Sequence, residues 1–124
     1  MIHSVAHVLM FVSSVRAAAE WYSSLLNLPA TFIDGNFAAI ETGSARLCFH
    51  LADSKVPAGR AGQVCYWRVG SLNDAMDRFR NAGAVLYRGP LQIASGEGMC
   101  QFADPFDNLF GLVGAYCEAR DEND

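Results

Sequence analysis

The segment Val12-Ser13-Ser14-Val15-Arg16-Ala17-Ala18-Ala19-Glu20-Trp21-Tyr22-Ser23-Ser24-Leu25-Leu26 decides the fold, because its pattern returns 57 positions later at residues 69–83. The matched pairs are alike in kind: Val12 and Val69, Ser14 and Ser71, Val15 and Leu72, Ala18 and Ala75, Glu20 and Asp77, Tyr22 and Phe79. In each copy an apolar strand runs into a serine that can cap a helix. A duplicated module of this size is typical of a chain that builds one cavity between its copies.

The first copy predicts one strand, one helix and three further strands. Residues 7–12 form the strand, Ser13 or Ser14 caps the helix, and apolar residues spaced three and four apart give the helix over 15–26 one buried face. Asn27 and Pro29 end the helix, since proline disfavours helical geometry in the residue before it. Three short strands are predicted at about 30–33, 37–41 and 46–51.

The second copy repeats this order. A strand at 63–69 leads through the cap Ser71 into a helix over 72–82 that closes at Gly83, and strands follow at about 85–88, 99–103 and 109–114. The organisation is therefore βαβββ twice within a single domain of residues 1–124. Module one covers about 1–52, a Gly- and Pro-containing linker about 53–62, module two about 63–117 and an acidic tail 118–124.

Composition narrows the class of protein. With 52% hydrophobic and 18% charged residues, the 124-residue chain is expected to form a packed globule. The net charge of −4 and the lack of a basic stripe exclude nucleic acid as the expected partner. No stretch reads as a signal peptide or as a span long enough for a membrane, so we expect a cytoplasmic protein. The cysteines, which are widely spaced, are expected to be reduced and buried: Cys48, Cys65, Cys100 and Cys117.

Two stretches carry a resemblance to a known family. Residues 7–12 with 18–28 are similar to a family strand and its "FYxxxLG" helix end, and residues 104–112 are similar to a closing "DPxGN" turn and strand. Over about residues 5–115 the chain resembles the vicinal oxygen chelate superfamily, which includes glyoxalase I, bleomycin-resistance proteins, fosfomycin-resistance enzymes and extradiol dioxygenases. Asp107 replaces the usual glycine, and Asp tolerates the positive φ that this turn needs.

The resemblance implies an α+β fold in which the two βαβββ modules form a cupped, mostly antiparallel sheet. Two half-cups, within one chain or across a homodimer, would enclose the site. Members that use a metal place its ligands on the first and last strand of each module, where alternate side chains point into the cup.

Strand alternation predicts which side chains face the cup. Helix-facing positions are expected at Val8, Met10 and Val12 and at their equivalents in the other strands. The remaining positions face inward: His7, Leu9, Phe11, Arg46, Cys48, His50, Val64, Tyr66, Arg68, Leu109, Gly111 and Val113. A β-bulge would reverse any of these assignments.

The resemblance implies an incomplete metal site. His7 matches the first ligand, and His50 is the best match to the second, with Cys48 as the substitute if the strand slips. Val64 stands at the third position and Gly111 at the fourth, where catalytic members carry a glutamate. A catalytic metal needs about three protein ligands. We therefore expect no metal cofactor. The alternative is a divalent Zn, Ni, Fe or Mn ion held by His7, His50 and, after a one-residue shift, Gln63.

We therefore expect a protein that binds a small organic molecule, an antibiotic or a metabolite, in the cup. His7, His50, Tyr66 and Arg68 would orient the ligand among apolar residues. Arg68 could instead extend out at the sheet edge. One alternative is an enzyme, namely a metal-dependent lyase or isomerase of glyoxalase type or a dioxygenase. The other is a structural or partner-binding module whose cup is filled by its own side chains.

Overall fold

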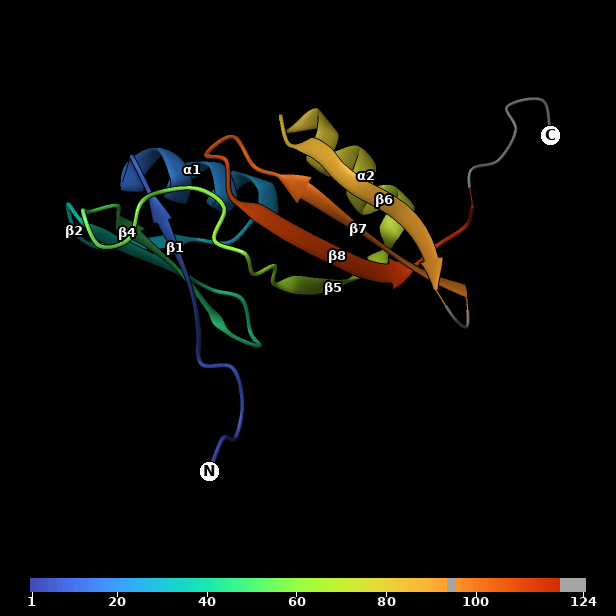
Figure 1. Cartoon of the computed structure of the whole chain (residues 1–124), viewed down its shortest axis with the longest axis horizontal. Helices are drawn as coiled ribbons and strands as arrows, with labels where there is room; N and C mark the ends of the chain where they lie inside the picture. The colour runs from blue at the N-terminus through green and yellow to red at the C-terminus, as the bar shows by residue number, and fades with distance from the viewer. Residues whose placement is uncertain (94–95, 119–124) are drawn as a thin grey trace. The chain divides into compact units, whose positions relative to one another are not determined.

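The computed structural model describes residues 1–93 and 96–118. The chain divides into two compact units, Met1–Arg60 and Ala61–Asp124. In each unit a four-stranded sheet carries one helix against one of its faces (Figure 1). The predicted α+β class and the order βαβββ, twice, are confirmed. Of the acidic tail predicted at 118–124, residues 119–124 lie outside the described residues.

The first unit holds four strands in the order β1-β4-β3-β2. Its elements are β1 (His7–Val12), α1 (Val15–Leu26), β2 (Ala30–Asp34), β3 (Phe37–Glu41) and β4 (Arg46–Leu51). β1 runs parallel to β4, whereas β4 with β3 and β3 with β2 are antiparallel. The parallel pair follows from the helical crossover, which returns the chain to the same end of the sheet.

The sequence around α1 sets both of its ends. Ser14 is the N-cap, and its hydroxyl accepts a hydrogen bond from the backbone N–H of Ala17 at 3.2 Å. Asn27 closes the helix in the left-handed region at φ 55°. The buried stripe of α1 packs on the sheet, where the ring of Tyr22 lies 5.3 Å from that of Phe49.

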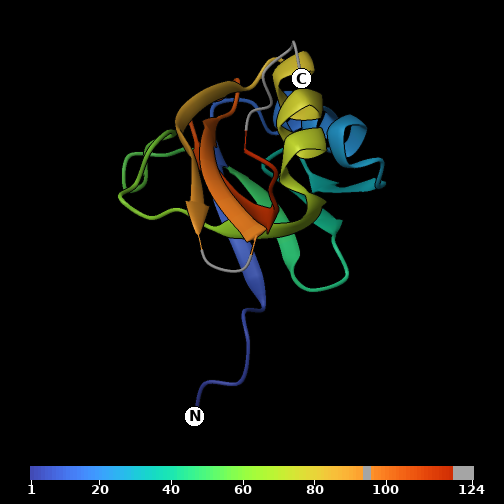
Figure 2. The ribbon, with the colours of Figure 1, turned by 90° about the vertical axis from the view of Figure 1, so that its right-hand side faces the viewer.

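The second unit repeats the arrangement with the order β5-β8-β7-β6 (Figure 2). Its elements are β5 (Tyr66–Ser71), α2 (Leu72–Asn81), β6 (Val85–Ile93), β7 (Glu97–Ala103) and β8 (Leu109–Ala115). Ser71 caps α2 through the backbone N–H of Asp74, and Gly83 follows the helix at φ 104°. Phe79 of α2 packs against Phe102 and Phe110 at centroid distances of 6.0 and 5.2 Å.

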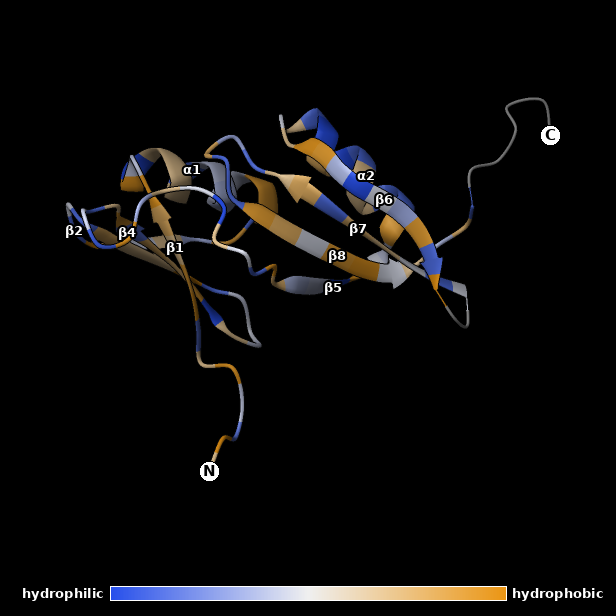
Figure 3. Cartoon of the chain, viewed as in Figure 1, coloured by the Kyte–Doolittle hydropathy of each residue, from blue (hydrophilic) through white to orange (hydrophobic). Residues whose placement is uncertain are grey.

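Helix α2 is amphipathic, with one buried apolar face and a hydrophilic surface. Much of β8 is hydrophobic, while α2 shows hydrophilic residues over much of its surface (Figure 3). Leu72, Met76 and Phe79 are the buried residues of α2, and their spacing of three and four makes one face. The core of each unit therefore lies between its helix and the sheet face that the helix covers.

Some predicted boundaries and burial states differ from the structure. β5 begins at Tyr66, not at residue 63, because its pairing with β8 starts with Tyr66 beside Gly111. β6 extends to Ile93, not to residue 88, and accommodates Pro90 at the sheet edge with two register shifts. Leu51 follows the inward-facing His50, so alternation predicts that it packs in the core, but it is 36% exposed at the end of β4. Cys117, predicted to be buried, is exposed after β8.

Two further expectations can be compared with the backbone. Asp107 has the predicted positive φ, at 66°. Among the described residues, no helix combines the length and hydrophobicity that crossing a membrane would need.

Candidate functional site on the open sheet faces

Each sheet has one face that its own helix leaves uncovered, and we call these the first and second open faces. On β1 the helix-facing residues Met10 and Val12 are buried, whereas His7 and Leu9 are exposed. The register of β1 against β4 places His7 beside Arg46, Leu9 beside Cys48, and Phe11 beside His50. The first open face therefore carries the predicted residues His7, Leu9, Phe11, Cys48 and His50.

His7 and Cys48 lie together at the start of this face. The Nδ1 atom of His7 is 3.9 Å from the Sγ atom of Cys48. Burial raises the pKa of the Cys48 thiol, although the Arg46 charge opposes the shift. Because the thiolate is the reactive form, Cys48 is a small buried side chain here and not an activated nucleophile.

His50 lies at the other end of the face, in an aromatic cluster. Its ring packs 5.2 Å from Phe11 and 6.2 Å from Phe37 of β3. Its Nδ1 atom is 2.8 Å from the carbonyl oxygen of Leu51, which fixes this nitrogen as the donor.

The strand register separates the two histidines that were considered as a ligand pair. His50 stands beside Phe11, four residues further along the strands than His7, which corresponds to about 13 Å at ~3.3 Å per residue. Zinc–nitrogen bonds of about 2.0–2.1 Å require both rings to approach one point. The structure therefore brings Cys48, and not His50, beside His7.

Tyr66 and Gly111 lie face to face on the second open face. They are register partners between β5 and β8. A Cβ atom at Gly111 would lie 2.5 Å from Cε2 and 2.7 Å from Cγ of the Tyr66 ring, far closer than the ~3.5–4 Å at which carbon atoms pack. The hydroxyl of Tyr66 accepts a hydrogen bond from Nε2 of Gln101 on β7, at 2.8 Å. The Tyr66 ring thus covers Gly111, and the hydrogen bond from Gln101 fixes the position of its hydroxyl.

Arg68 lies two residues along on the same strand. Its side chain is 67% exposed, and its NH1 atom is 2.8 Å from Oε2 of Glu97 on β7. The sequence left two orientations open for Arg68, into the cup or outward at the sheet edge. In the structure its side chain is exposed to solvent and forms an ion pair across the open face. Surface pairs of this kind contribute little to stability.

The remaining predicted positions of the second unit lie on β8 or just before β5. Leu109 and Val113 are half-buried on β8, beside Ala103 and Met99 of β7. Val64 and Gln63 precede β5 and are not strand residues, although Gly111 still donates a backbone hydrogen bond to the carbonyl oxygen of Cys65 at 2.8 Å.

The donor chemistry of these residues does not fit the metal that the resemblance implies. The guanidinium of Arg46 stands beside His7 and would repel a divalent cation, and valine offers no donor atom. The Tyr66 ring fills the space that a glutamate at residue 111 would need. Within residues 1–93 and 96–118, no group of three or more His, Cys, Asp or Glu side chains could hold a metal ion.

Three polar residues of the open faces received no role from the sequence. Alternation places Arg46 inward but does not reveal its partner, Glu41 at the end of β3, whose Oε2 is 2.8 Å from Arg46 Nε. Gln101 was missed because its role depends on Tyr66, which is 35 positions away in sequence. The available signal for Gln101 was its polar side chain between the apolar residues Cys100 and Phe102, which is the alternation expected of a strand.

Comparisons with solved structures support the fold. A superfamily member from Sphaerobacter thermophilus superposes with a TM-score of 0.74 at 21% identity, over 92% of this chain and 98% of the other. A family enzyme from Burkholderia phytofirmans gives 0.75 at 16% identity, over 91% and 99%. A genomically encoded fosfomycin resistance protein from Listeria monocytogenes gives 0.73 at 14% identity, over 92% and 94%. These identities establish similarity of fold alone.

Sequence comparison identifies the family. A search of curated proteins finds no match to the chain. The profile of the Glyoxalase/Bleomycin resistance protein/Dioxygenase superfamily matches residues 4–112, which is most of the chain. The chain belongs to the glyoxalase/bleomycin resistance protein/dioxygenase superfamily.

Proposed function

We propose that this protein binds a small organic molecule on its open sheet faces without a metal ion. The observation that carries the proposal is the Tyr66 ring lying over Gly111, with its hydroxyl held by Gln101. A ring at that point offers a flat apolar surface with a polar edge, which suits an organic ligand and leaves no room for a metal-binding carboxylate.

Each open face supplies the mixture of polar and apolar groups that is usual for a small-ligand site. On the first open face, His7 and His50 are the polar groups, and the apolar part comes from Leu9, which is 45% exposed, and from half-buried Phe11. On the second open face, Arg68 is the polar group, and half-buried Leu109 and Val113 are apolar. A few polar groups among apolar walls give orientation and affinity together.

The proposal extends to assembly and compartment. We propose a homodimer, as the resemblance implies, and β6 supports it as an edge strand with exposed Val85 and Leu91. Light scattering should then give twice the chain mass, and a monomeric mass would contradict the homodimer. The cytoplasm is the compartment we propose, and fractionation of cells that express the protein checks it.

The test is a thermal-shift screen of protein that has been stripped of metal with a chelator. The panel holds organic metabolites and antibiotics, with fosfomycin included because a protein of this fold confers resistance to it. A ligand present at ~100 times its Kd stabilises the native state by about 2.7 kcal/mol. We expect at least one compound to raise the melting temperature of metal-free wild-type protein, and to do so less in Tyr66→Ala.

Arg16→Gln is the matched control, since Arg16 pairs with Glu20 on the outer surface of α1. It should respond to the compound as the wild type does. Stabilisation that appears only after a divalent metal is added would favour the metal-dependent lyase, isomerase or dioxygenase. A panel without any response would favour a module that binds no small ligand.

A further inference from the structure

The first unit contains a cavity that the proposed residues only partly use. Its volume is about 400 Å³, and it lies where β1 begins and where β3 turns into β4. Its lining residues are Val5, Ala6, His7, Glu41, Gly43, Ser44, Ala45 and Arg46. Small residues form most of the wall. The chemistry of the cavity is therefore determined by His7, Glu41, Arg46 and the hydroxyl of Ser44.

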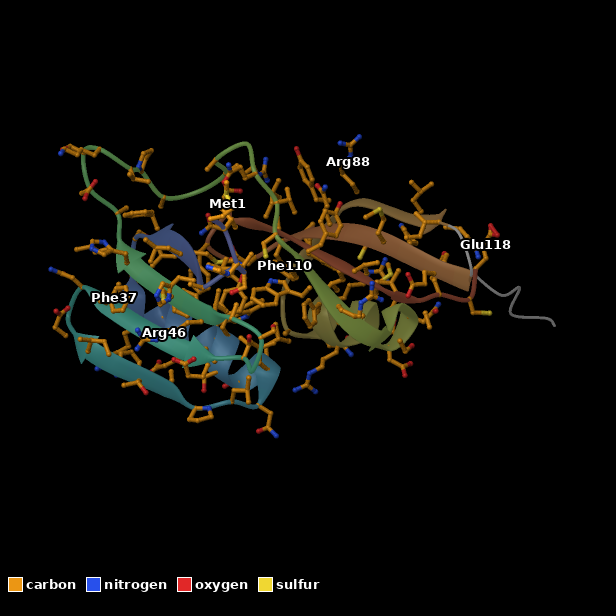
Figure 4. The ribbon with its side chains drawn as sticks, turned by 90° about the horizontal axis from the view of Figure 1, so that it is seen from below. Met1, Phe37, Arg46, Arg88, Phe110 and Glu118 are labelled. Carbon is orange, nitrogen blue, oxygen red and sulfur yellow. The ribbon has the colours of Figure 1, made fainter. Side chains whose placement is uncertain are left out.

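Arg46, labelled in Figure 4, contributes the positive charge of this cavity. Its side chain is 33% exposed, while that of its partner Glu41 is 74% exposed. The Nε atom of Arg46 lies 2.8 Å from Glu41 Oε2, yet it is buried and makes no hydrogen bond, because the N–H direction misses the oxygen. Because Nε lacks an aligned acceptor and the counter-ion is solvated, the partly exposed guanidinium gains from a better-placed anion at its other N–H groups.

His7 adds a second donor beside Arg46. The two residues are register partners on β1 and β4. Because Nδ1 of His7 faces the sulfur of Cys48, the other ring nitrogen, Nε2, is the one left for a ligand, and it donates in the tautomer whose Nδ1 accepts from the thiol. Ser44 contributes a hydroxyl from the β3–β4 turn. Guanidinium, imidazole and hydroxyl donors together match an anionic group with two or three oxygen atoms.

We propose that this cavity binds the anionic end of the organic ligand, a carboxylate or a phosphate, with Arg46 as the main contact and His7 as the second. The inference rests on the proposed function and specifies its ligand class. Glu41 serves as the internal counter-ion that the ligand displaces. The same Arg46 that disfavours a metal cation at His7 is what selects an anion there.

The experiment follows backbone amide shifts by NMR while the whole chain is titrated with inorganic phosphate, with benzoate, and with benzamide as the neutral analogue of benzoate. Chloride keeps the ionic strength constant, since exposed charges are screened by salt. We expect saturable shifts at residues 44–46 with phosphate or benzoate and none with benzamide. Tighter binding of phosphate than of benzoate assigns a phosphate ligand, and the reverse order assigns a carboxylate ligand.

Variants test the named contacts. Arg46→Gln should weaken anion binding by about tenfold or more, because a charge-assisted pair is lost. Glu41→Gln should strengthen it, since the competing carboxylate is removed, and this gain cannot result from damage to the fold. Arg16→Gln, which breaks a distant Arg–Glu pair, should leave the affinity unchanged.

The failure of this inference is distinguishable from that of the proposed function. If neither anion saturates, or if Arg46→Gln has no more effect than Arg16→Gln, the anion cavity is wrong. An organic compound that stabilises wild type and Arg46→Gln equally would leave the proposed function intact and overturn only the anion cavity.

Discussion

Gly111 shows how one missing side chain determines what can bind beside it. The Tyr66 ring lies where the Cβ atom of any other residue would be, and Gln101 holds its hydroxyl. Gly111→Ala should therefore destabilise the fold by about 1–3 kcal/mol through overpacking, measured as the free energy of unfolding in urea.

A glycine on the neighbouring strand provides the control for this substitution. A Cβ atom at Gly70 would meet no atom within 4 Å, so Gly70→Ala should change stability by less than ~1 kcal/mol. In a Tyr66→Ala background, Gly111→Ala should lose most of its cost. Equal costs in the two backgrounds would show that the ring does not occupy this space.

Cys100 gives a pH dependence whose sign is fixed. Burial raises the pKa of its thiol to about 11 from an ordinary value of 9.0. Between pH 9 and pH 11 the unfolded chain loses this proton while the folded chain keeps it, so the unfolded state binds fewer protons and stability falls as pH rises. Cys100→Ala should make this fall shallower, as measured by urea midpoints across that range.

Ser13→Ala, an exposed substitution that removes no ionisable group, is the control and should retain the wild-type slope. Identical slopes for wild type and Cys100→Ala would contradict the burial of the Cys100 thiol.

The sequence predicts which sheet face some side chains occupy, but not the contacts that they make there. Alternation was enough to place His7, Leu9 and Cys48 on one face, because β1 and β4 are regular. It could not predict that Tyr66 covers Gly111 or that Gln101 holds Tyr66, since these contacts join β5 to β7 and β8, which lie much later in the sequence. The distance between His7 and His50 also depended on a parallel register that alternation does not determine.

At the scale of elements, the helix caps are where local sequence acts most directly. The sequence left Ser13 and Ser14 as alternative caps of α1, and the structure selects Ser14. Ser14→Ala should cost about 1 kcal/mol in the free energy of unfolding, because the N–H of Ala17 loses its acceptor.

Ser13→Ala is the matched control and should stay within about 0.5 kcal/mol of wild type, as exposed substitutions usually do. A larger loss from Ser13→Ala than from Ser14→Ala would place the cap one residue earlier.

Element boundaries show where sequence patterns stop being sufficient. Both helices were predicted closely, because a cap, an apolar stripe and a terminating residue coincide. β5 and β6 were not, since their ends depend on pairing with β8 and β7. The late start of β5 is the reason that Val64 and Gln63 fall outside the strand.

At the scale of the whole molecule, the duplication was readable because both copies preserve the order of strand, cap and helix. The two units keep the same topology yet carry different chemistry on their open faces: histidines and Arg46 on the first, Tyr66 and an Arg68–Glu97 pair on the second. Within residues 1–93 and 96–118, no group of three or more His, Cys, Asp or Glu side chains could hold a metal ion on either face, and our proposal is that the ligand binds without one.

Elemental analysis of the native protein tests this account most directly. The chain should be purified without chelators and without a histidine tag, from cells grown with zinc, nickel, iron and manganese. We predict a metal content well below one ion per chain, unchanged in the His7→Ala/His50→Ala double variant. One zinc, nickel, iron or manganese ion per chain that disappears in the double variant would contradict the account.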